Sequence, residues 1–312
     1  MATLLCTIGT RGSPLALAQA RMTQAALALS FGCALDAIAI EIISTMGDRT
    51  QDRPLSEIGG KGLFTKEIDI AQLEGKVDVA VHSSKDLPTE LPEGLVIAGF
   101  LPREDIRDAL IAPRHKTLDA LPQGARVGTV SLRRQALLKH LRPDLVVEPL
   151  RGNVETRLNK ARSGEFDAVL LAVAGLKRLG LAGEITEALD DARFLPAVGQ
   201  GAICLVARAE DTRTLEAIAR FAHAPTQVEL KAERAFLKVL DGSCRTPIGG
   251  SARFKDGRIT FRGLVLSPDG TITFEASGEA PEAEAAALGE RLGREIKAKL
   301  PEGFLSTPPA KA

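Results

Sequence analysis

The chain has 312 residues, of which 45% are hydrophobic, so it is long enough for two or three domains that each bury a core. Forty basic residues balance forty acidic ones, and this zero formal net charge argues against wholesale nucleic-acid binding while allowing a local basic cleft. No apolar stretch is long enough to cross a bilayer and the start of the chain lacks a secretory signal pattern, so we expect a soluble, cytoplasmic protein with no membrane partner.

The first predicted unit alternates helices and strands. Ser13 and Pro14 are the favoured N-cap and first residue of a helix, which Gly32 would end. Further on, apolar runs predict strands at 37–43, 77–81 and 95–99 and a helix at 66–73. Such alternation is typical of an α/β fold with a largely parallel sheet.

A second α/β unit follows the charged, proline-containing segment at 101–108. It is predicted to contain strands at 109–111, 126–130, 145–147 and 168–173 and helices at 132–141 and 154–162. The glycine-rich residues 195–201 then lead into an apolar strand at 203–207, which would return to the sheet of the first unit. Two chain crossings of this kind would form a hinge.

The C-terminal part of the chain changes character. Turn signals at 255–258 and 267–270 join strands at 251–254, 259–266 and 271–276 into an antiparallel meander, and a helix at 282–300 would cover one face. A further helix is predicted at 228–240. The run at 240–250, which contains Cys244, lies between this helix and the sheet.

Cys244 lies in a polar loop that contains Gly and Pro, next to Arg245. A thiol beside a guanidinium in such a loop is placed for reaction rather than for packing, although an ordinary loop thiol fits the same pattern. The other cysteines, at positions 6, 33 and 204, show neither C-x-x-C spacing nor a neighbouring histidine. The sequence therefore suggests neither a zinc site nor a disulfide framework.

Arginine stands beside Ser or Asn at the start of three predicted helices. The three groups are Arg11 with Ser13, then Ser131 with Arg133 and Arg134 after Thr129, and Arg151 with Asn153 and Arg157. Helix starts offer free backbone amides to anions, and Arg suits the planar recognition of carboxylate or phosphate. Solvated surface arginines explain one such group well but three poorly, so we infer a polyanionic ligand.

Several polar residues, among them His82, Ser83, Lys85 and Asp86, directly follow a predicted buried strand. In α/β folds ligands gather at this end of strands, so Asp86 is a candidate acid, base or electrostatic stabiliser, with a turn-capping role before Pro88 as the alternative. Lys61 would add positive charge nearby. The residues around Lys61 are not a P-loop, because Leu55 and Gly62 replace its first Gly and its Ser or Thr.

The chain resembles the porphobilinogen deaminase family, also called the hydroxymethylbilane synthases, from about Ile8 to about Leu266. The resemblance rests on motifs in the same order at residues 9–16, 58–66, 81–87, 103–105, 128–134, 150–154, 171–179 and 195–201 and on the Cys244 loop. It implies two α/β domains similar to periplasmic binding proteins that form a cleft, and a C-terminal α+β domain with a three-stranded antiparallel sheet. We expect these domains at 1–102 with 198–222, at 103–197 and at 223–312.

The resemblance also implies a chemistry. Four porphobilinogen units would be joined head to tail, with loss of ammonia, onto a dipyrromethane cofactor attached by a thioether to Cys244, and hydrolysis would release hydroxymethylbilane for tetrapyrrole biosynthesis. Asp86 would be the catalytic carboxylate, and no metal or nucleotide is implied. Cofactor binding would fall to Cys244, Ser83, Lys85, Asp86, Thr129, Ser131, Arg133 and Arg134, and substrate binding to Arg11, Ser13, Lys61, Arg151, Arg157 and Gln200.

A non-catalytic binding protein or regulator that uses the same cleft for an anionic solute is the competing interpretation. A reactive loop cysteine in a third domain has no role in simple solute capture, and no DNA-binding element is recognisable. We therefore favour an enzyme that acts on a small molecule, and we expect it to be a monomer.

Overall fold

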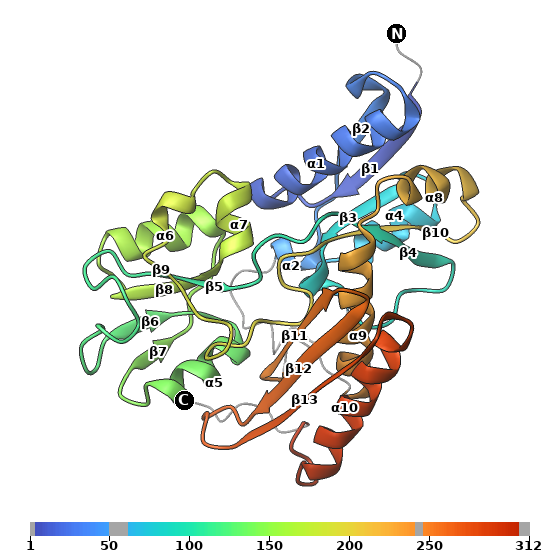
Figure 1. Ribbon diagram of the computed structural model, residues 1–312. Helices are drawn as coiled ribbons and strands as arrows, with labels where there is room; N and C mark the ends of the chain where they lie inside the picture. The colour runs from blue at the N-terminus through green and yellow to red at the C-terminus, as the bar shows by residue number, and fades with distance from the viewer. Residues whose placement is uncertain (1–3, 50–61, 241–245, 306–312) are drawn as a thin grey trace. The chain divides into compact units, whose positions relative to one another are not determined.

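The computed structural model describes residues 4–49, 62–240 and 246–305 (Figure 1). The chain divides into two compact units, one formed by Met1–Glu104 with Gly201–Gln227 and the other by Asp105–Gln200 with Val228–Ala312. The three-domain boundaries expected from the sequence stay a prediction. Among the described residues, no helix combines the length and the apolar character needed to cross a bilayer.

The first unit is built on a five-stranded sheet in the order β2-β1-β3-β10-β4. Its strands are β1 (Cys6–Thr10), β2 (Ile38–Ile42), β3 (Val79–Ser83), β4 (Leu95–Phe100) and β10 (Ile203–Arg208). The helical elements are α1 (Pro14–Phe31), η1 (Leu35–Ala37), α2 (Met46–Arg49), α4 (Lys66–Leu73), η2 (Ser84–Asp86) and α8 (Thr212–Ala219). The core of the sheet includes Ile8, Val79 and Leu205, and α1 packs Ala20 and Leu27 against it.

The return of β10 to this sheet confirms the sequence prediction, and so does the largely parallel sheet, since β10 alone runs against the common direction of β1, β2, β3 and β4. Strand β1 is parallel to β2 and β3, whereas β10 is antiparallel to both β3 and β4. The reason is the connection: β10 enters after a long excursion of the chain and not through a helical crossover, which is the link that imposes parallel pairing. Strand β1 itself was not predicted.

Helix α1 begins and ends where its capping residues predict. The Ser13 hydroxyl accepts a hydrogen bond from the backbone N–H of Ala16 at 3.3 Å, and Pro14 is the first helical residue. Gly32 ends the helix in the left-handed conformation, with a φ of 65°, which a glycine adopts without strain.

The second unit contains another five-stranded sheet, in the order β7-β6-β8-β5-β9. Its strands are β5 (Asp108–Ile111), β6 (Arg126–Gly128), β7 (Val146–Glu148), β8 (Ala168–Ala172) and β9 (Glu187–Ala188). The helical elements are α5 (Leu132–Leu141), α6 (Val154–Arg162), α7 (Val173–Arg178) and η3 (Ala182–Glu184). This sheet is mixed too, because β5 is antiparallel to β8 and β9.

The same unit carries the predicted C-terminal meander, formed by β11 (Ile248–Lys255), β12 (Arg258–Leu266) and β13 (Thr273–Pro281). Around it lie α9 (Ala224–Val239), η4 (Glu282–Glu284) and α10 (Ala285–Lys299), and Figure 1 shows α10 along one face of the sheet. Leu264 and Leu266 of β12 share a buried cluster with Leu137 of α5. The meander and the second five-stranded sheet therefore have a core in common.

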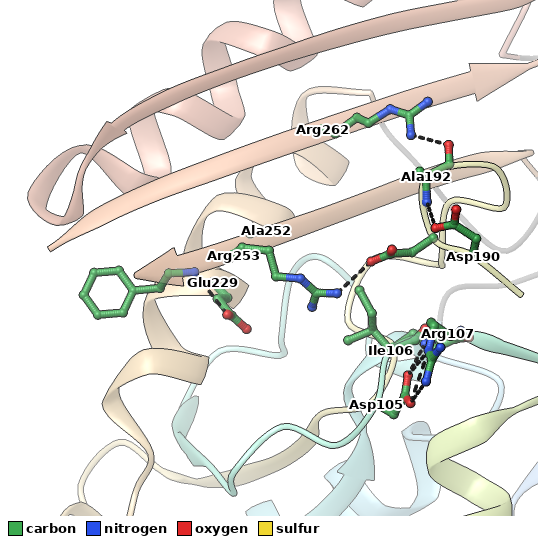
Figure 2. Close-up of polar contacts among 12 residues, drawn as sticks. Asp105, Ile106, Arg107, Asp190, Ala192, Glu229, Ala252, Arg253 and Arg262 are labelled. Carbon is green, nitrogen blue, oxygen red and sulfur yellow. Dashed lines mark hydrogen bonds and ion pairs between the residues drawn. The ribbon is translucent and has the colours of Figure 1, made fainter. Parts of the chain in front are cut away.

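Polar contacts add to this shared core (Figure 2). Arg253 of β11 pairs with Asp191 at 2.7 Å, and Arg262 of β12 donates a hydrogen bond to the carbonyl oxygen of Ala192 at 2.6 Å. The chain segment that follows β9 is thus held by two neighbouring strands of the C-terminal sheet.

Candidate functional site

A pocket in the first unit lies where β1 and β3 end. Arg11 directly follows β1, and Asp86 lies in the short helix that follows β3. Because β1 and β3 are parallel neighbours, their carboxyl ends meet at one edge of the sheet. The polar and aromatic residues that line the pocket are Arg11, Ser13, Gln19, Phe64, His82, Ser83 and Asp86.

Helix α1 contributes one wall of this pocket. Gln19 is buried, and its amide nitrogen lies 2.9 Å from the hydroxyl oxygen of Ser83, whose hydroxyl lies 3.2 Å from the amide oxygen of Gln19. The two side chains therefore fix each other. The structure brings four of the predicted residues together here, namely Arg11, Ser13, Ser83 and Asp86, whereas Lys85 is half-buried and does not line the pocket.

Arg11 is held from two sides. The carboxylate of Asp48 accepts hydrogen bonds from Nε and Nη2 of Arg11, and the guanidinium carbon lies 4.2 Å from the centre of the Phe64 ring. Burial raises the pKa of Asp48, but the hydrogen bonds from Arg11 and Thr45 outweigh that effect and lower it below its ordinary value. The ion pair thus persists at neutral pH.

His82 is the buried member of the pocket. Burial, with a smaller contribution from the charge of Arg11, lowers the pKa of His82 to about 4, so its ring is neutral at physiological pH. Its Nε2 atom has no hydrogen-bond partner in the described part of the chain. The positive charge of the pocket therefore comes from Arg11 and not from His82.

The predicted anion site of the second unit lies at the start of α5. Ser131 is the N-cap and accepts a hydrogen bond from the backbone N–H of Arg134 at 3.5 Å, while the Thr129 hydroxyl accepts one from the N–H of Ser131 at 3.2 Å. Arg133 and Arg134 are only 4% and 5% exposed. The sequence places these two arginines at a helix start correctly, but it does not reveal that they are buried.

Both buried arginines pair with Asp108, the first residue of β5. Nη1 of Arg133 lies 2.8 Å from Oδ2 of Asp108, and Nη2 of Arg134 lies 2.6 Å from Oδ1. Burial raises the pKa of Asp108, and the charges of the two guanidiniums overcome this and hold it below its ordinary value. Asp108 is therefore ionised, and the cluster contains two cations and one anion.

The third predicted arginine group lies around the start of α6. Asn153 caps this helix by accepting a hydrogen bond from the N–H of Thr156 at 2.9 Å, and Nε of Arg157 donates to the carbonyl oxygen of Gly152 at 2.9 Å. Arg151 and Arg157 are both half-buried. The structure therefore confirms the helix start and leaves both side chains partly accessible to solvent.

The structure describes only one of the last three predicted site residues, Gln200, Cys244 and Lys61. Gln200 is buried and donates hydrogen bonds to the carbonyl oxygen of Ile106 and to Asp108. Cys244 and Lys61 lie outside the described residues.

Sequence reasoning missed Gln19, Asp48 and Asp108. Asp108 had the clearest local signal, since an aspartate that opens an apolar strand needs a buried partner. Gln19 and Asp48 carried no comparable signal, because their partners lie 64 and 37 positions away.

Comparisons with known proteins agree with this arrangement. A family model described as "Porphobilinogen deaminase, dipyromethane cofactor binding domain" matches residues 6–216, and one described as "Porphobilinogen deaminase, C-terminal domain" matches residues 227–298. Curated proteins named porphobilinogen deaminase from Nitrobacter hamburgensis and Nitrobacter winogradskyi are 54% and 55% identical over 303 residues, which is 97% of this chain and 96% of each relative.

Solved structures are more distant. The second substrate binding domain of a putative amino acid ABC transporter from Streptococcus pneumoniae has a TM-score of 0.42 and 13% identity, covering 75% of this chain and 94% of that one. A likeness at this level gives no basis for an inference about function.

Proposed function

This chain belongs to the porphobilinogen deaminase family, and on that premise we propose that it joins four porphobilinogen units head to tail, with loss of ammonia, and releases hydroxymethylbilane by hydrolysis. The observation that carries the proposal is the coverage: the two family models and the two curated relatives extend over nearly the whole chain. The pocket lined by Arg11 and Asp86 is consistent with this function. The guanidinium of Arg11 can bind a carboxylate of the substrate, and the carboxylate of Asp86 lies in the same pocket.

The described residues fit the dipyrromethane cofactor that the family model names. The cofactor is a polyanion, because each of its pyrrole rings carries an acetate and a propionate arm. At the start of α5, Arg133 and Arg134 outnumber their single carboxylate partner, and the buried Nε of Arg133 has no hydrogen-bond partner among the described residues. An orphaned buried donor of this kind suits an incoming anion.

We place the cofactor's attachment at Cys244 and its carboxylate-binding groups at Lys85, Arg133 and Arg134. Ser83, Thr129 and Ser131 would add hydroxyl groups, and Asp86 would face the pyrrole nitrogens. When bound, the cofactor supplies the primer to which porphobilinogen is joined.

Asp86 has the catalytic role in this proposal. Loss of ammonia from porphobilinogen leaves positive charge on its pyrrole system, and a fixed carboxylate stabilises such charge more strongly than water does. Arg11 and Ser13 lie in the same pocket as Asp86 and would bind the substrate's acetate and propionate groups. Lys61, Arg151 and Arg157 complete the proposed set of substrate-binding residues, whereas Gln200, which the sequence placed in that set, is buried with its amide bonded to Ile106 and Asp108 and would act from there.

The attachment site is tested by the intact mass of protein purified from cells that make porphobilinogen. Wild type and Cys204→Ser are expected to carry an adduct of two porphobilinogen-derived rings, and Cys244→Ser is expected to carry none. Cys204 is a matched control because it is a fully buried cysteine in β10. An unmodified wild-type protein contradicts the proposed function, and an adduct on Cys244→Ser contradicts the proposed attachment.

We also propose that the enzyme acts as a monomer in the cytoplasm, in line with the sequence expectations. Light scattering coupled to size-exclusion chromatography tests the first part: the mass in solution should be that of one chain, 33.1 kDa, plus the cofactor. Cell fractionation tests the second.

A further inference from the structure

One buried carboxylate, Asp108, orients both arginines at the start of α5. Oδ1 of Asp108 accepts hydrogen bonds from Nε of Arg134 at 2.8 Å and lies 2.6 Å from its Nη2, which is a two-point contact. Oδ2 lies 2.8 Å from Nη1 of Arg133. Asp108 is fully buried, and it contacts Arg134 at two points and Arg133 at one.

Backbone carbonyls complete the fixed orientation. Nη1 of Arg133 donates to the carbonyl oxygen of Leu195 at 2.7 Å, and Nη1 of Arg134 donates to that of Leu170 at 2.9 Å. Asp108 carries one negative charge and the two arginines carry two positive charges, and the neutral carbonyl oxygens do not offset the remaining positive charge. A buried, surplus charge is costly unless an anion approaches it, so the cluster is suited to receive a carboxylate.

Asp108 is itself held in place by the segment at 195–200. Nε2 of Gln200 donates to Oδ1 of Asp108 at 3.2 Å and to the carbonyl oxygen of Ile106 at 2.7 Å. The Leu195 carbonyl that receives Arg133 belongs to the same segment. The segment therefore fixes both the carboxylate and one of the arginines.

The segment at 195–200 is in turn bonded to the elements on either side of Cys244. Buried Glu233 of α9 accepts a hydrogen bond from the N–H of Gly199 at 2.7 Å, and Gly250 of β11 donates one to the carbonyl oxygen of Pro196 at 2.9 Å. Helix α9 ends at Val239 and β11 begins at Ile248. The orientation of the arginines is thus coupled to the two elements between which Cys244 occurs in the sequence.

We propose that Asp108 is a positioning residue, which holds Arg133 and Arg134 in the orientation that receives the carboxylates of the dipyrromethane cofactor, with Gln200 as its support. The proposal rests on the proposed function. Asp108 acts through the arginines and contacts neither substrate nor cofactor.

The test follows cofactor attachment and not turnover. Apoprotein is produced in cells unable to make porphobilinogen, porphobilinogen is added at a series of concentrations, and the appearance of the two-ring adduct is followed by intact mass. Asp108→Asn keeps the shape of the side chain and removes its charge. We expect the half-saturating porphobilinogen concentration for attachment to rise about tenfold or more, because charged hydrogen bonds of this kind carry at least that factor.

Asp78→Asn is the matched control. Asp78 pairs with Arg208 at 2.7 Å and accepts a hydrogen bond from the N–H of Thr7 at 2.8 Å, in the first unit. Its substitution is expected to lower the melting temperature and to leave the half-saturating concentration unchanged. If both variants lose attachment equally, or if folded Asp108→Asn matches wild type, the inference is overturned.

Gln200→Met covers the case in which Asp108→Asn does not fold. It removes the amide that holds Asp108 and keeps a similar volume, so we expect a smaller rise in the half-saturating concentration, and wild-type attachment by this variant overturns the inference. Wild-type apoprotein in the same assay separates a failure of the proposed function from a failure of the role of Asp108. If wild-type apoprotein takes up no adduct, the proposed function is wrong. If it takes up the adduct, the variants test only the role of Asp108.

Discussion

Asp48 holds the guanidinium of Arg11 at two points, with Nε at 3.1 Å and Nη2 at 2.5 Å from the same carboxylate oxygen. Thr45 fixes that carboxylate through its hydroxyl and its backbone N–H, at 2.7 and 3.2 Å. The Phe64 ring covers the other side of the guanidinium. Arg11 therefore enters the pocket in a fixed orientation.

Replacement of Asp48 by Asn is expected to raise the half-saturating porphobilinogen concentration several-fold and to change the maximal rate little. The reason is that Arg11 would lose its orientation, and a residue that binds substrate and transition state alike affects KM more than kcat. Steady-state kinetics measure both quantities. Thr45→Val removes only one hydrogen bond to Asp48 and should show a smaller change in the same direction. A lower half-saturating concentration for Asp48→Asn would mean instead that Asp48 competes with the substrate for Arg11.

Replacement of Asp86 by Ala is expected to leave most of the cofactor adduct in place and to reduce turnover by about a hundredfold or more, the usual loss when a group that stabilises developing charge is removed. Intact mass reports the adduct, and formation of hydroxymethylbilane reports turnover. Ser83→Ala, which changes a neighbouring pocket residue without removing a charge, is the comparison. Near-normal turnover by Asp86→Ala removes this residue from its proposed role.

Asp69 in α4 is expected to make the first unit less stable as the pH rises. Burial raises the pKa of Asp69 from 3.8 to about 6. Between these two values the folded state binds more protons than the unfolded state, so the free energy of unfolding falls as the pH rises, by up to about 3 kcal/mol, and levels off about one pH unit above the folded-state pKa.

Denaturant unfolding of Asp69→Asn between pH 4 and 7 checks this expectation. The variant should lose the decline in stability across that window and be more stable than wild type at pH 7. Glu74→Gln, at an exposed carboxylate just after the same helix, should retain the wild-type pH dependence. An unchanged pH profile for Asp69→Asn contradicts the assignment.

Gly289→Ala is expected to destabilise the packing of α10 against α9. An added Cβ at this position would lie 2.0 Å from the carbonyl oxygen of Ala232, which is backbone and cannot move aside cheaply. Overpacking of this kind costs about 1 to 3 kcal/mol. Gly183→Ala, where an added Cβ meets nothing within 4 Å, is the control in thermal melting. Equal melting temperatures for Gly289→Ala and Gly183→Ala would show that α9 and α10 accommodate the added methyl group without loss of stability.

Local sequence signals determined much of the secondary structure. The helices α4, α5 and α6 occupy the predicted ranges, because caps such as Ser131 and Asn153 and the spacing of apolar residues act within a few positions. The order of motifs along the chain likewise predicted the family that the comparisons identify. Both kinds of information can be read along the chain without knowledge of its tertiary contacts.

Strand direction and the partners of the charged groups were decided only by the tertiary structure. The antiparallel pairings of β10 with β3 and of β5 with β8 join strands that lie far apart in the sequence, so no local signal gives their direction. The pairing of Asp108 with Arg133 and Arg134, and of Asp48 with Arg11, joins residues far apart in sequence, so the sequence does not say which charge meets which. The fold brings these groups together, and in the buried Asp108 cluster a charge is too costly to leave without a partner.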